Sequence, residues 1–137
     1  TAIMSERFIL LDANLLIGAF DHDKDNPKHI EAKSIVTELL NDDKVKIAIT
    51  PLIRYEVLRG VKRIAVNEMQ AILDDFQEFE ITDKEGNFAS QIYRLAKKQT
   101  NKHNFDIFHY AVSKIRQLEW QSLDSDFSTL ENALNHS

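Results

Sequence analysis

The sequence contains no cysteine, which excludes disulfide bonds, thiolate metal sites and a cysteine nucleophile. It also has only 3 glycines and 2 prolines, too few for an all-β fold with many tight turns. No apolar run approaches the roughly 18 residues of a membrane-spanning helix. The segment Thr1 to Arg7 lacks the charged start and apolar middle of a signal peptide. We therefore expect a cytoplasmic protein that does not contact a membrane.

An excess of positive charge is absent as well. The formal net charge is -5, so a nucleic acid would be attracted only by a local basic surface or by a bound cation. The hydrophobic fraction of 43% and the charged fraction of 28% are typical of a folded protein. A chain of 137 residues is the size of one domain, and we expect a single domain over residues 1–137 with its core at about residues 7–134.

Strands and helices alternate along the predicted chain. The four apolar residues of Phe8–Leu11 are typical of a buried strand, and Thr50 followed by Pro51 predicts the start of a helix. Strands are predicted at Phe8–Leu11, Val45–Ile49, Phe79–Ile81 and Trp120–Leu123, and a turn at Asp83–Gly86. Helices are predicted at Leu15–Phe20, Lys28–Asn41, Leu52–Gly60, Ile64–Phe76, Phe88–Ala96, Phe105–Gln117 and from Phe127 to about Leu134. Because parallel strands need crossover connections, this order predicts an α/β fold with a parallel sheet covered on both faces.

Four carboxylates stand out by their positions. Asp12 ends the first strand, Asp106 opens a helix and Asp124 follows the last strand, so these three belong to the edge of the sheet where parallel sheets bind ligands. Glu56 lies inside an apolar helix, so its side chain would reach this edge of the sheet from a helix beside it. Each residue also has an ordinary structural interpretation: a helix cap for Asp12, a favourable helix dipole for Asp106, a turn for Asp124, and an exposed position beside Arg59 or Arg63 for Glu56.

Taken together, the carboxylates indicate a metal site. Several carboxylates in one cleft repel one another and take up protons unless cations compensate them. Oxygen ligands without cysteine or paired histidine favour a hard ion such as Mg²⁺ or Mn²⁺, which also binds phosphate oxygens of a substrate. Such a site is suited to the hydrolysis of phosphodiester bonds.

Four segments in the same order along the chain resemble the motifs of PIN-domain nucleases, in particular VapC-type toxins of bacterial toxin–antitoxin systems. They are Leu11–Ile17, Tyr55–Gly60, Asp106–Ala111 and Leu123–Phe127. The resemblance implies a three-layer α/β/α sandwich with a short, mostly parallel central sheet. It also implies a hydrolase, a Mg²⁺- or Mn²⁺-dependent endoribonuclease, that forms a homodimer and is inhibited by a cognate antitoxin protein.

The same resemblance assigns roles to single residues. It implies that Asp12, Glu56, Asp106 and Asp124 bind the metal and that Asn14 organises the site from a second shell. Asp126 is the alternative to Asp124 as the metal-facing residue. The family often has Thr or Ser where this chain has Ala13, so a hydroxyl group that could support the site is missing.

Basic residues near Glu56 and Asp106 are candidates for RNA contacts. An acidic protein needs a local basic rim to hold phosphates, although an ordinary solvated helix face explains any one of these residues equally well. The candidates are Arg54, Arg59, Lys62, Arg63, Lys102 and His103.

Three other interpretations compete with this one. A metal loop around His22 and His29 does not match zinc-ligand spacing, and a solvated loop is simpler. A phosphatase or phosphotransfer domain with Asp12 as nucleophile would want a second Asp at position 14, where this chain has Asn14. A non-catalytic PIN-like scaffold would be expected with a broken acidic set, and this set is complete.

Overall fold

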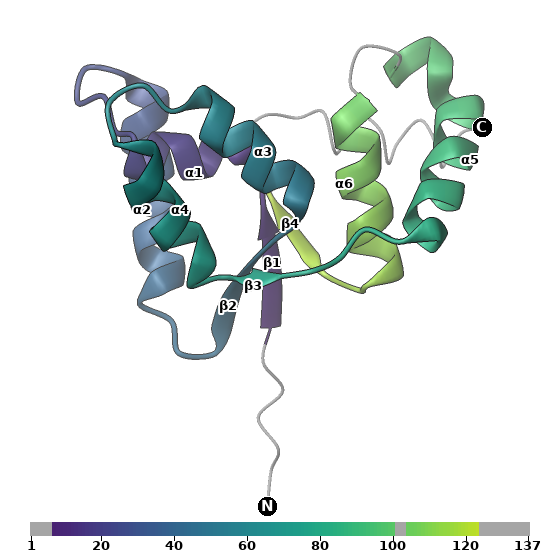
Figure 1. The fold of residues 1–137 in the computed structure, drawn as a ribbon, viewed down its shortest axis with the longest axis horizontal. Coiled ribbons are helices and arrows are strands. Elements are labelled where there is room, and N and C mark those ends of the chain that lie inside the picture. Colours follow the sequence, from purple (N-terminus) through teal and green to yellow (C-terminus); the bar gives the residue numbers. More distant parts are fainter. Residues whose placement is uncertain (1–6, 101–103, 124–137) are drawn as a thin grey trace, which may run out of the picture. The chain divides into compact units, whose positions relative to one another are not determined.

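The structure, a computed structural model, describes residues 7–100 and 104–123 (Figure 1). It divides the chain into two compact units. Of the described residues, the first unit contains 7–80 and 119–123, and the second contains 81–100 and 104–118. The helix predicted to end near Leu134 lies outside the described residues. None of the described helices combines the length and the apolar content that crossing a membrane requires.

The first unit is built on a sheet of four parallel strands. They are β1 (Arg7–Leu11), β2 (Val45–Ile49), β3 (Gln77–Glu78) and β4 (Glu119–Gln121), in the order β3-β2-β1-β4. In β1, Leu10 pairs with Ala48 of β2 on one side and with Trp120 of β4 on the other. The apolar end of β1 is almost completely buried, as expected for the centre of a parallel sheet. The predicted α/β class with a parallel sheet is confirmed.

Four helices belong to this unit: α1 (Ala13–Phe20), α2 (Pro27–Leu40), α3 (Pro51–Gly60) and α4 (Val66–Asp74). Helix α1 packs against α2 and α3, and α3 packs against α4. Helices α1, α2 and α4 gather on one side of the sheet (Figure 1). The fully buried side chains of the four helices include Leu15, Leu16, Ile53, Met69 and Leu73, whose burial stabilises the unit through the hydrophobic effect.

Polar caps and prolines define where two of these helices begin. The side chain of Asn26 accepts a hydrogen bond from the backbone of Lys28, and Pro27 is the first residue of α2. The hydroxyl of Thr50 accepts one from the backbone of Ile53 at 3.2 Å, and the next residue, a proline, opens α3. A proline costs nothing at a position whose N–H has no partner inside the helix, so the sequence specifies both starts locally.

The third strand does not lie where the sequence predicts it. Its pairing with β2 involves Gln77 and Glu78, and the backbone N–H of Phe79 adds a hydrogen bond to the carbonyl of Ile49 at 2.9 Å. The predicted strand at Phe79–Ile81 is therefore wrong in position, because the observed strand ends at Glu78. The apolar residues that suggested it serve packing, since the Phe79 ring meets Phe8 edge to face at 5.7 Å. The last strand is likewise shifted and shorter, at Glu119–Gln121.

The second unit contains α5 (Asp83–Thr100) and α6 (Asn104–Ile115), which pack against each other. The predicted turn at Asp83–Gly86 is wrong, because α5 already begins at Asp83. Both oxygens of the buried Glu85 carboxylate accept hydrogen bonds from Thr82, at 2.9 and 3.3 Å, and Arg116 donates another at 3.1 Å. This network fixes the start of α5 despite the glycine in its first turn.

Helix α6 ends two residues earlier than predicted. Gln117 adopts a left-handed backbone with a φ of 56°, and the N–H of Leu118 donates to the carbonyl of Ser113 at 2.8 Å. This is the arrangement in which glycine usually ends a helix. Because glutamine occupies the position, the sequence carries no signal for the end of the helix.

We predict opposite effects for alanine at two helical glycines. A Cβ atom on Gly18 of α1 would lie 2.7 Å from the Cβ of Ala32 and 3.3 Å from the backbone of His29 in α2, whereas one on Gly86 of α5 would meet nothing within 4 Å. We expect Gly18→Ala to lower the free energy of unfolding by about 1–3 kcal/mol through overpacking. The control Gly86→Ala should raise it by about 0.5–1 kcal/mol through helix propensity. Urea denaturation measures both, and equal effects would contradict the close packing of α1 on α2.

Candidate active site

Asp12 lies at the carboxyl end of β1 and is 6% exposed. Its backbone carbonyl accepts hydrogen bonds from Leu15 and Leu16, so it occupies the cap position of α1, but its side chain makes no cap hydrogen bond. Instead, the hydroxyl of Ser122 donates to Asp12 Oδ2 at 3.1 Å. The interpretation of this carboxylate as a helix cap is therefore wrong. A buried carboxylate held by a hydroxyl is a fitting metal ligand.

Glu56 belongs to the same unit and lies in the middle of α3, where it is half-buried. Helix α3 buries Ile53 and Val57 completely and packs against α1, the helix that follows Asp12. Asn14 is exposed in the first turn of α1. Asp12 and Asn14 at the start of α1 and Glu56 in α3 thus belong to two helices that pack against each other.

The other candidate ligands belong to other parts of the chain. Asp106 is half-buried in the first turn of α6, in the second unit, and His109 one turn later is completely buried. Asp124, Asp126, Lys102 and His103 lie outside the described residues. Within residues 7–100 and 104–123, no three His, Cys, Asp or Glu side chains form a group that could hold a metal ion. The predicted set includes Asp124, so it extends beyond this part of the chain.

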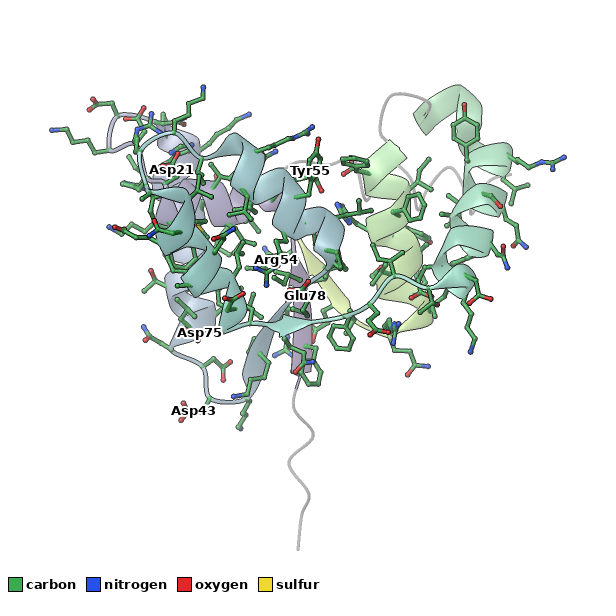
Figure 2. All side chains as sticks on the ribbon, viewed as in Figure 1. Asp21, Asp43, Arg54, Tyr55, Asp75 and Glu78 are labelled. Carbon is green, nitrogen blue, oxygen red and sulfur yellow. The ribbon has the colours of Figure 1, made fainter. Side chains whose placement is uncertain are left out.

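Two of the predicted RNA-binding arginines are held by carboxylates. Arg54 of α3 contacts Asp74 Oδ1 at 2.9 Å. It also contacts Glu78 Oε1 at 3.0 Å, and Figure 2 shows these two side chains near each other. The hydrogen bond from Arg54 to Glu78 raises the pKa of Arg54 above its usual value, although burial opposes the shift. Arg54 therefore connects α3 to the end of α4 and to β3, and its charge is compensated.

Arg63 is bound in the same way by the loop after α1. Its guanidinium contacts Asp21 Oδ2 at 3.4 Å and Asp23 Oδ2 at 3.2 Å. Lys62 and Arg59 are exposed as well, and the guanidinium of Arg59 lies over the ring of Tyr55 at 5.1 Å from its centroid. Arg54 and Arg63 thus contact carboxylates of other segments, while Arg59 contacts an aromatic ring of its own helix.

Asp21 is the centre of a connection that the sequence did not reveal. Its carboxylate is 1% exposed and accepts hydrogen bonds from the backbone of Lys62 at 2.9 Å, Arg63 at 2.6 Å and Ile64 at 2.8 Å. Burial acts to raise the pKa of Asp21, but these bonds and the charge of Arg63 outweigh it and hold the pKa below its usual value. Asp21 thus ties the end of α1 to the loop after α3.

The histidines near Asp21 contact the backbone of α1 and of the loop that follows it. The backbone N–H of Asp23 donates to His29 Nδ1 at 2.9 Å, and His22 Nδ1 lies 3.2 Å from the carbonyl oxygen of Gly18. Both rings are therefore used to shape the loop between α1 and α2.

A pocket of about 430 Å³ with a mixed polar and apolar lining lies elsewhere on the first unit. It is lined by residues from the start of β1 and β2 and from the ends of α2 and α4: Phe8, Leu39, Leu40, Val45, Lys46, Ile47, Asp75, Phe76 and Gln77. Because the strands are parallel, this pocket lies toward the opposite edge of the sheet from Asp12. It contributes nothing to the candidate site.

Comparison with known families decides the assignment of the fold. The family model described as PIN domain matches residues 9–132. The chain belongs to the PIN domain family. This match spans residues of both units and confirms the resemblance seen in the four sequence motifs. Among curated proteins, none matches the sequence.

Solved structures share the fold of this PIN domain. A toxin–antitoxin complex from Klebsiella pneumoniae contains a chain with 20% sequence identity and a TM-score of 0.68, and the match covers 88% of this chain and 90% of that one. VapC20 from Mycobacterium tuberculosis, a toxin that cleaves the sarcin–ricin loop, has 17% identity and a TM-score of 0.61 over 88% of this chain and 92% of its own. At these identities the likeness establishes the α/β fold.

Sequence reasoning missed Ser122 as a neighbour of Asp12 in this PIN domain. The signal was present, because Ser122 follows the last strand and the carboxyl ends of parallel strands share one edge. Asp21 was harder to find, since it stands in an acidic run with Asp23 and Asp25. Its partners lie more than 40 residues away and no local pattern identifies them.

We predict that Asp21→Asn destabilises this PIN domain in a pH-dependent way. The pKa of Asp21 is lowered on folding, so its stabilisation is complete above the ordinary value of 3.8 and is lost as the pH falls through the lower folded-state pKa. We expect a loss of about 1.5–3 kcal/mol at neutral pH.

Urea denaturation at several pH values between about 7 and 3 measures this difference between wild type and variant. The difference should shrink toward the acidic end. Asp25→Asn, at an exposed position in the same loop, is the matched control and should change stability by at most about 0.5 kcal/mol. A loss for Asp21→Asn that stays constant over the whole range would contradict the lowered pKa.

Proposed function

We propose that this PIN domain is a Mg²⁺- or Mn²⁺-dependent endoribonuclease and the toxin of a toxin–antitoxin pair. Membership in the PIN domain family supports a nuclease. The fold shared with VapC20 and with the Klebsiella complex supports the more specific role of a toxin acting on RNA in the cytoplasm. On this proposal the two units work together as one domain, as the extent of the family match suggests.

The observation that carries the proposal is the position of Asp12 and its contact with Ser122. It is buried at the carboxyl end of the central strand, its side chain does not cap the following helix, and Ser122 holds one of its oxygens. Asp21 and Glu85, the other buried carboxylates of the described residues, are surrounded by N–H and O–H donors that explain them structurally. Asp12 is thus the buried acid whose position matches a ligand site.

The residues fit a hard divalent ion by their chemistry, since carboxylate oxygens without thiolates are the donors that Mg²⁺ and Mn²⁺ prefer. Asp12, Glu56, Asp106 and Asp124 would hold it, with Asp126 as the alternative to Asp124. A divalent ion bound there lowers the pKa of a water and neutralises charge on the phosphate oxygens.

The chain's own residues supply position and charge. Ser122 orients the carboxylate of Asp12 through its hydrogen bond, and Asn14, in the first turn of α1, supports the same site. Exposed cations such as Arg59 and Lys62 hold neighbouring phosphates of the RNA without reading its sequence. Water attacks the phosphorus atom, the bond to the leaving ribose oxygen breaks, and that oxygen takes up a proton. No covalent enzyme intermediate forms.

Two protein partners belong to the proposal. One is a second copy of the chain in a homodimer, and the other is a cognate antitoxin that inhibits the nuclease. The Klebsiella structure that shares this fold is a toxin–antitoxin complex, which supports the second partner.

We predict that Asp12→Asn abolishes metal-dependent cleavage of RNA. The substitution removes one negative charge and one metal-binding oxygen at a buried position, so we expect the rate to fall by roughly 100-fold or more, in line with several kcal/mol of lost electrostatic stabilisation. Purified protein free of antitoxin is incubated with cellular RNA and either Mg²⁺ or Mn²⁺, and fragments are resolved on denaturing gels.

The controls are a chelator, which should stop cleavage, and Asp25→Asn at an exposed position, which should leave it unchanged. Cleavage that survives the chelator or the substitution of Asp12 would reject the metal mechanism. A phosphorylated aspartate recovered after incubation with a phosphate donor would instead support an aspartyl nucleophile.

We predict that Ser122→Ala weakens metal binding although Ser122 is no ligand itself. It removes the 3.1 Å hydrogen bond that orients Asp12, and loss of such an outer contact typically costs about 10- to 100-fold in metal affinity or activity. Calorimetric titration with Mn²⁺ gives the dissociation constant. Ser122→Thr keeps the hydroxyl and should restore binding, and Ser90→Ala on the exposed side of α5 is the matched control. Unchanged affinity in Ser122→Ala would show that Asp12 needs no such support.

A further inference from the structure

Strand β2 is only partly paired on the side that faces β3. Strand β3 is two residues long and pairs with Ala48 and Ile49, at the end of β2. Among the described residues, no strand pairs with residues 45–47 on this side. The chain before β3 still follows the end of α4, where the N–H of Phe76 donates to the carbonyl of Leu73 at 3.1 Å. The first half of β2 is therefore an open edge of the sheet.

Main-chain groups of β2 point toward this open side. Along a strand, the N–H and C=O groups of successive residues point alternately to the two neighbouring strands. The carbonyl of Ile49 accepts a hydrogen bond from the N–H of Phe79 at 2.9 Å, on the side of β3. Val45 and Ile47 precede Ile49 by four and two residues, so the carbonyl of Val45 and the N–H of Ile47 point to the same side. Such groups are the ones that an added strand binds.

The pocket of about 430 Å³ at the start of β2 includes this open edge. Phe8 pairs with Lys46 in register, so their side chains share one face of the sheet. Val45 and Ile47, which are buried, belong to the opposite face. Residues of both faces therefore line one pocket. An added strand suits such a space, because its own side chains also point alternately to the two faces.

The two faces of the pocket differ in chemistry. Lys46 is exposed, and within the described residues it has no ion pair. On the other face, Leu39, Leu40 and Phe76 come from the ends of α2 and α4, which gather on one side of the sheet (Figure 1), and Leu40 is 53% exposed. Asp75, exposed at the end of α4, would repel an acidic group there. The pocket thus suits an acidic side chain on the face of Lys46 and apolar side chains on the other.

A second copy of the chain does not meet these requirements. The outward carbonyl of Val45 and N–H of Ile47 flank Lys46, so two such edges paired about a two-fold axis would place Lys46 of one copy opposite Lys46 of the other. Like charges directly opposite destabilise a strand pair, and lysine on an edge strand commonly prevents self-association. A strand that carries a carboxylate at this position would be attracted instead.

We propose that the open edge of β2 binds an extended segment of a partner protein in which acidic and apolar residues alternate. The segment adds a strand to the sheet through main-chain hydrogen bonds to Val45 and Ile47. Its carboxylates face Lys46, and its apolar side chains contact Leu39 and Leu40. The inference goes beyond the proposed ribonuclease and does not depend on it, since this site lies toward the opposite edge of the sheet from Asp12.

Nuclear magnetic resonance of the ¹⁵N-labelled full chain tests the added strand. The probe is a capped synthetic peptide of alternating valine and glutamate. In one comparison peptide lysine replaces glutamate, and in another every backbone nitrogen is methylated. We expect the glutamate peptide to shift the amide signals of residues 45–47 and to slow hydrogen exchange at the N–H of Ile47. The lysine peptide should bind about 2- to 10-fold more weakly, and the methylated peptide should not bind.

Variants test the chemistry of the two faces. Lys46→Glu should reverse the preference, so that the lysine peptide binds about 2- to 10-fold more tightly than the glutamate peptide. Lys33→Glu, at an exposed lysine of α2 outside the pocket, changes the net charge equally and should keep the wild-type preference. Leu40→Asn should weaken binding of the glutamate peptide by about 3- to 10-fold, because an apolar contact is lost.

Three other results would overturn the proposal. Absent shifts at residues 45–47, or equal binding of the methylated peptide, would reject the added strand. An unchanged preference in Lys46→Glu would reject the acidic partner. A molar mass that rises with concentration in light scattering, and rises less in Leu40→Asn, would assign the pocket to a second copy of the chain. None of these measurements depends on RNA cleavage, so the proposed nuclease is tested separately.

Discussion

A carboxylate buried at the end of the central strand is the constraint on which this PIN domain depends. Strand β1 is paired on both sides and almost fully buried, so the chain leaves the sheet at Asp12 inside the protein. Charge at such a position is costly unless hydrogen bonds or cations compensate it. The carbonyl of Asp12 starts α1 and Ser122 binds its side chain, so one residue joins the sheet, a helix and the candidate site.

The partners of the buried acids distinguish structure from function better than burial does. Asp12, Asp21 and Glu85 are all buried, with at most 6% exposed, so exposure alone does not separate them. Burial acts to raise the pKa of Glu85, but hydrogen bonds from Thr82 and Arg116 outweigh it and lower the pKa, as the backbone of residues 62–64 does for Asp21. These two acids are fixed in their charged form within their own units. They connect helices and loops, and nothing in their contacts suggests catalysis.

Sequence reasoning identified the features with local causes. The alternation of strands and helices and the helix start at Thr50 follow from periodicity and capping, and the structure agrees. The start of α5 was missed because a glycine in its first turn obscured the Thr82–Glu85 contact. Partners far apart in sequence were also missed: Arg54 with Glu78, Asp21 with Lys62, and Asp12 with Ser122, which are 24, 41 and 110 positions apart. The predicted metal set remains a prediction for the same reason, since its members come from four distant segments.

The ion pairs of the arginines also constrain how an acidic protein can bind RNA. The chain has 17 basic and 22 acidic residues, and carboxylates already compensate Arg54 and Arg63. The attraction of nucleic-acid phosphates grows with the number of uncompensated cations that face them. The ion pairs of Arg54 and Arg63 therefore limit this attraction around α3. Ligation of a phosphate through a bound metal ion depends much less on net charge. A nuclease that binds its substrate in this way can therefore remain acidic overall and avoid general adhesion to nucleic acid.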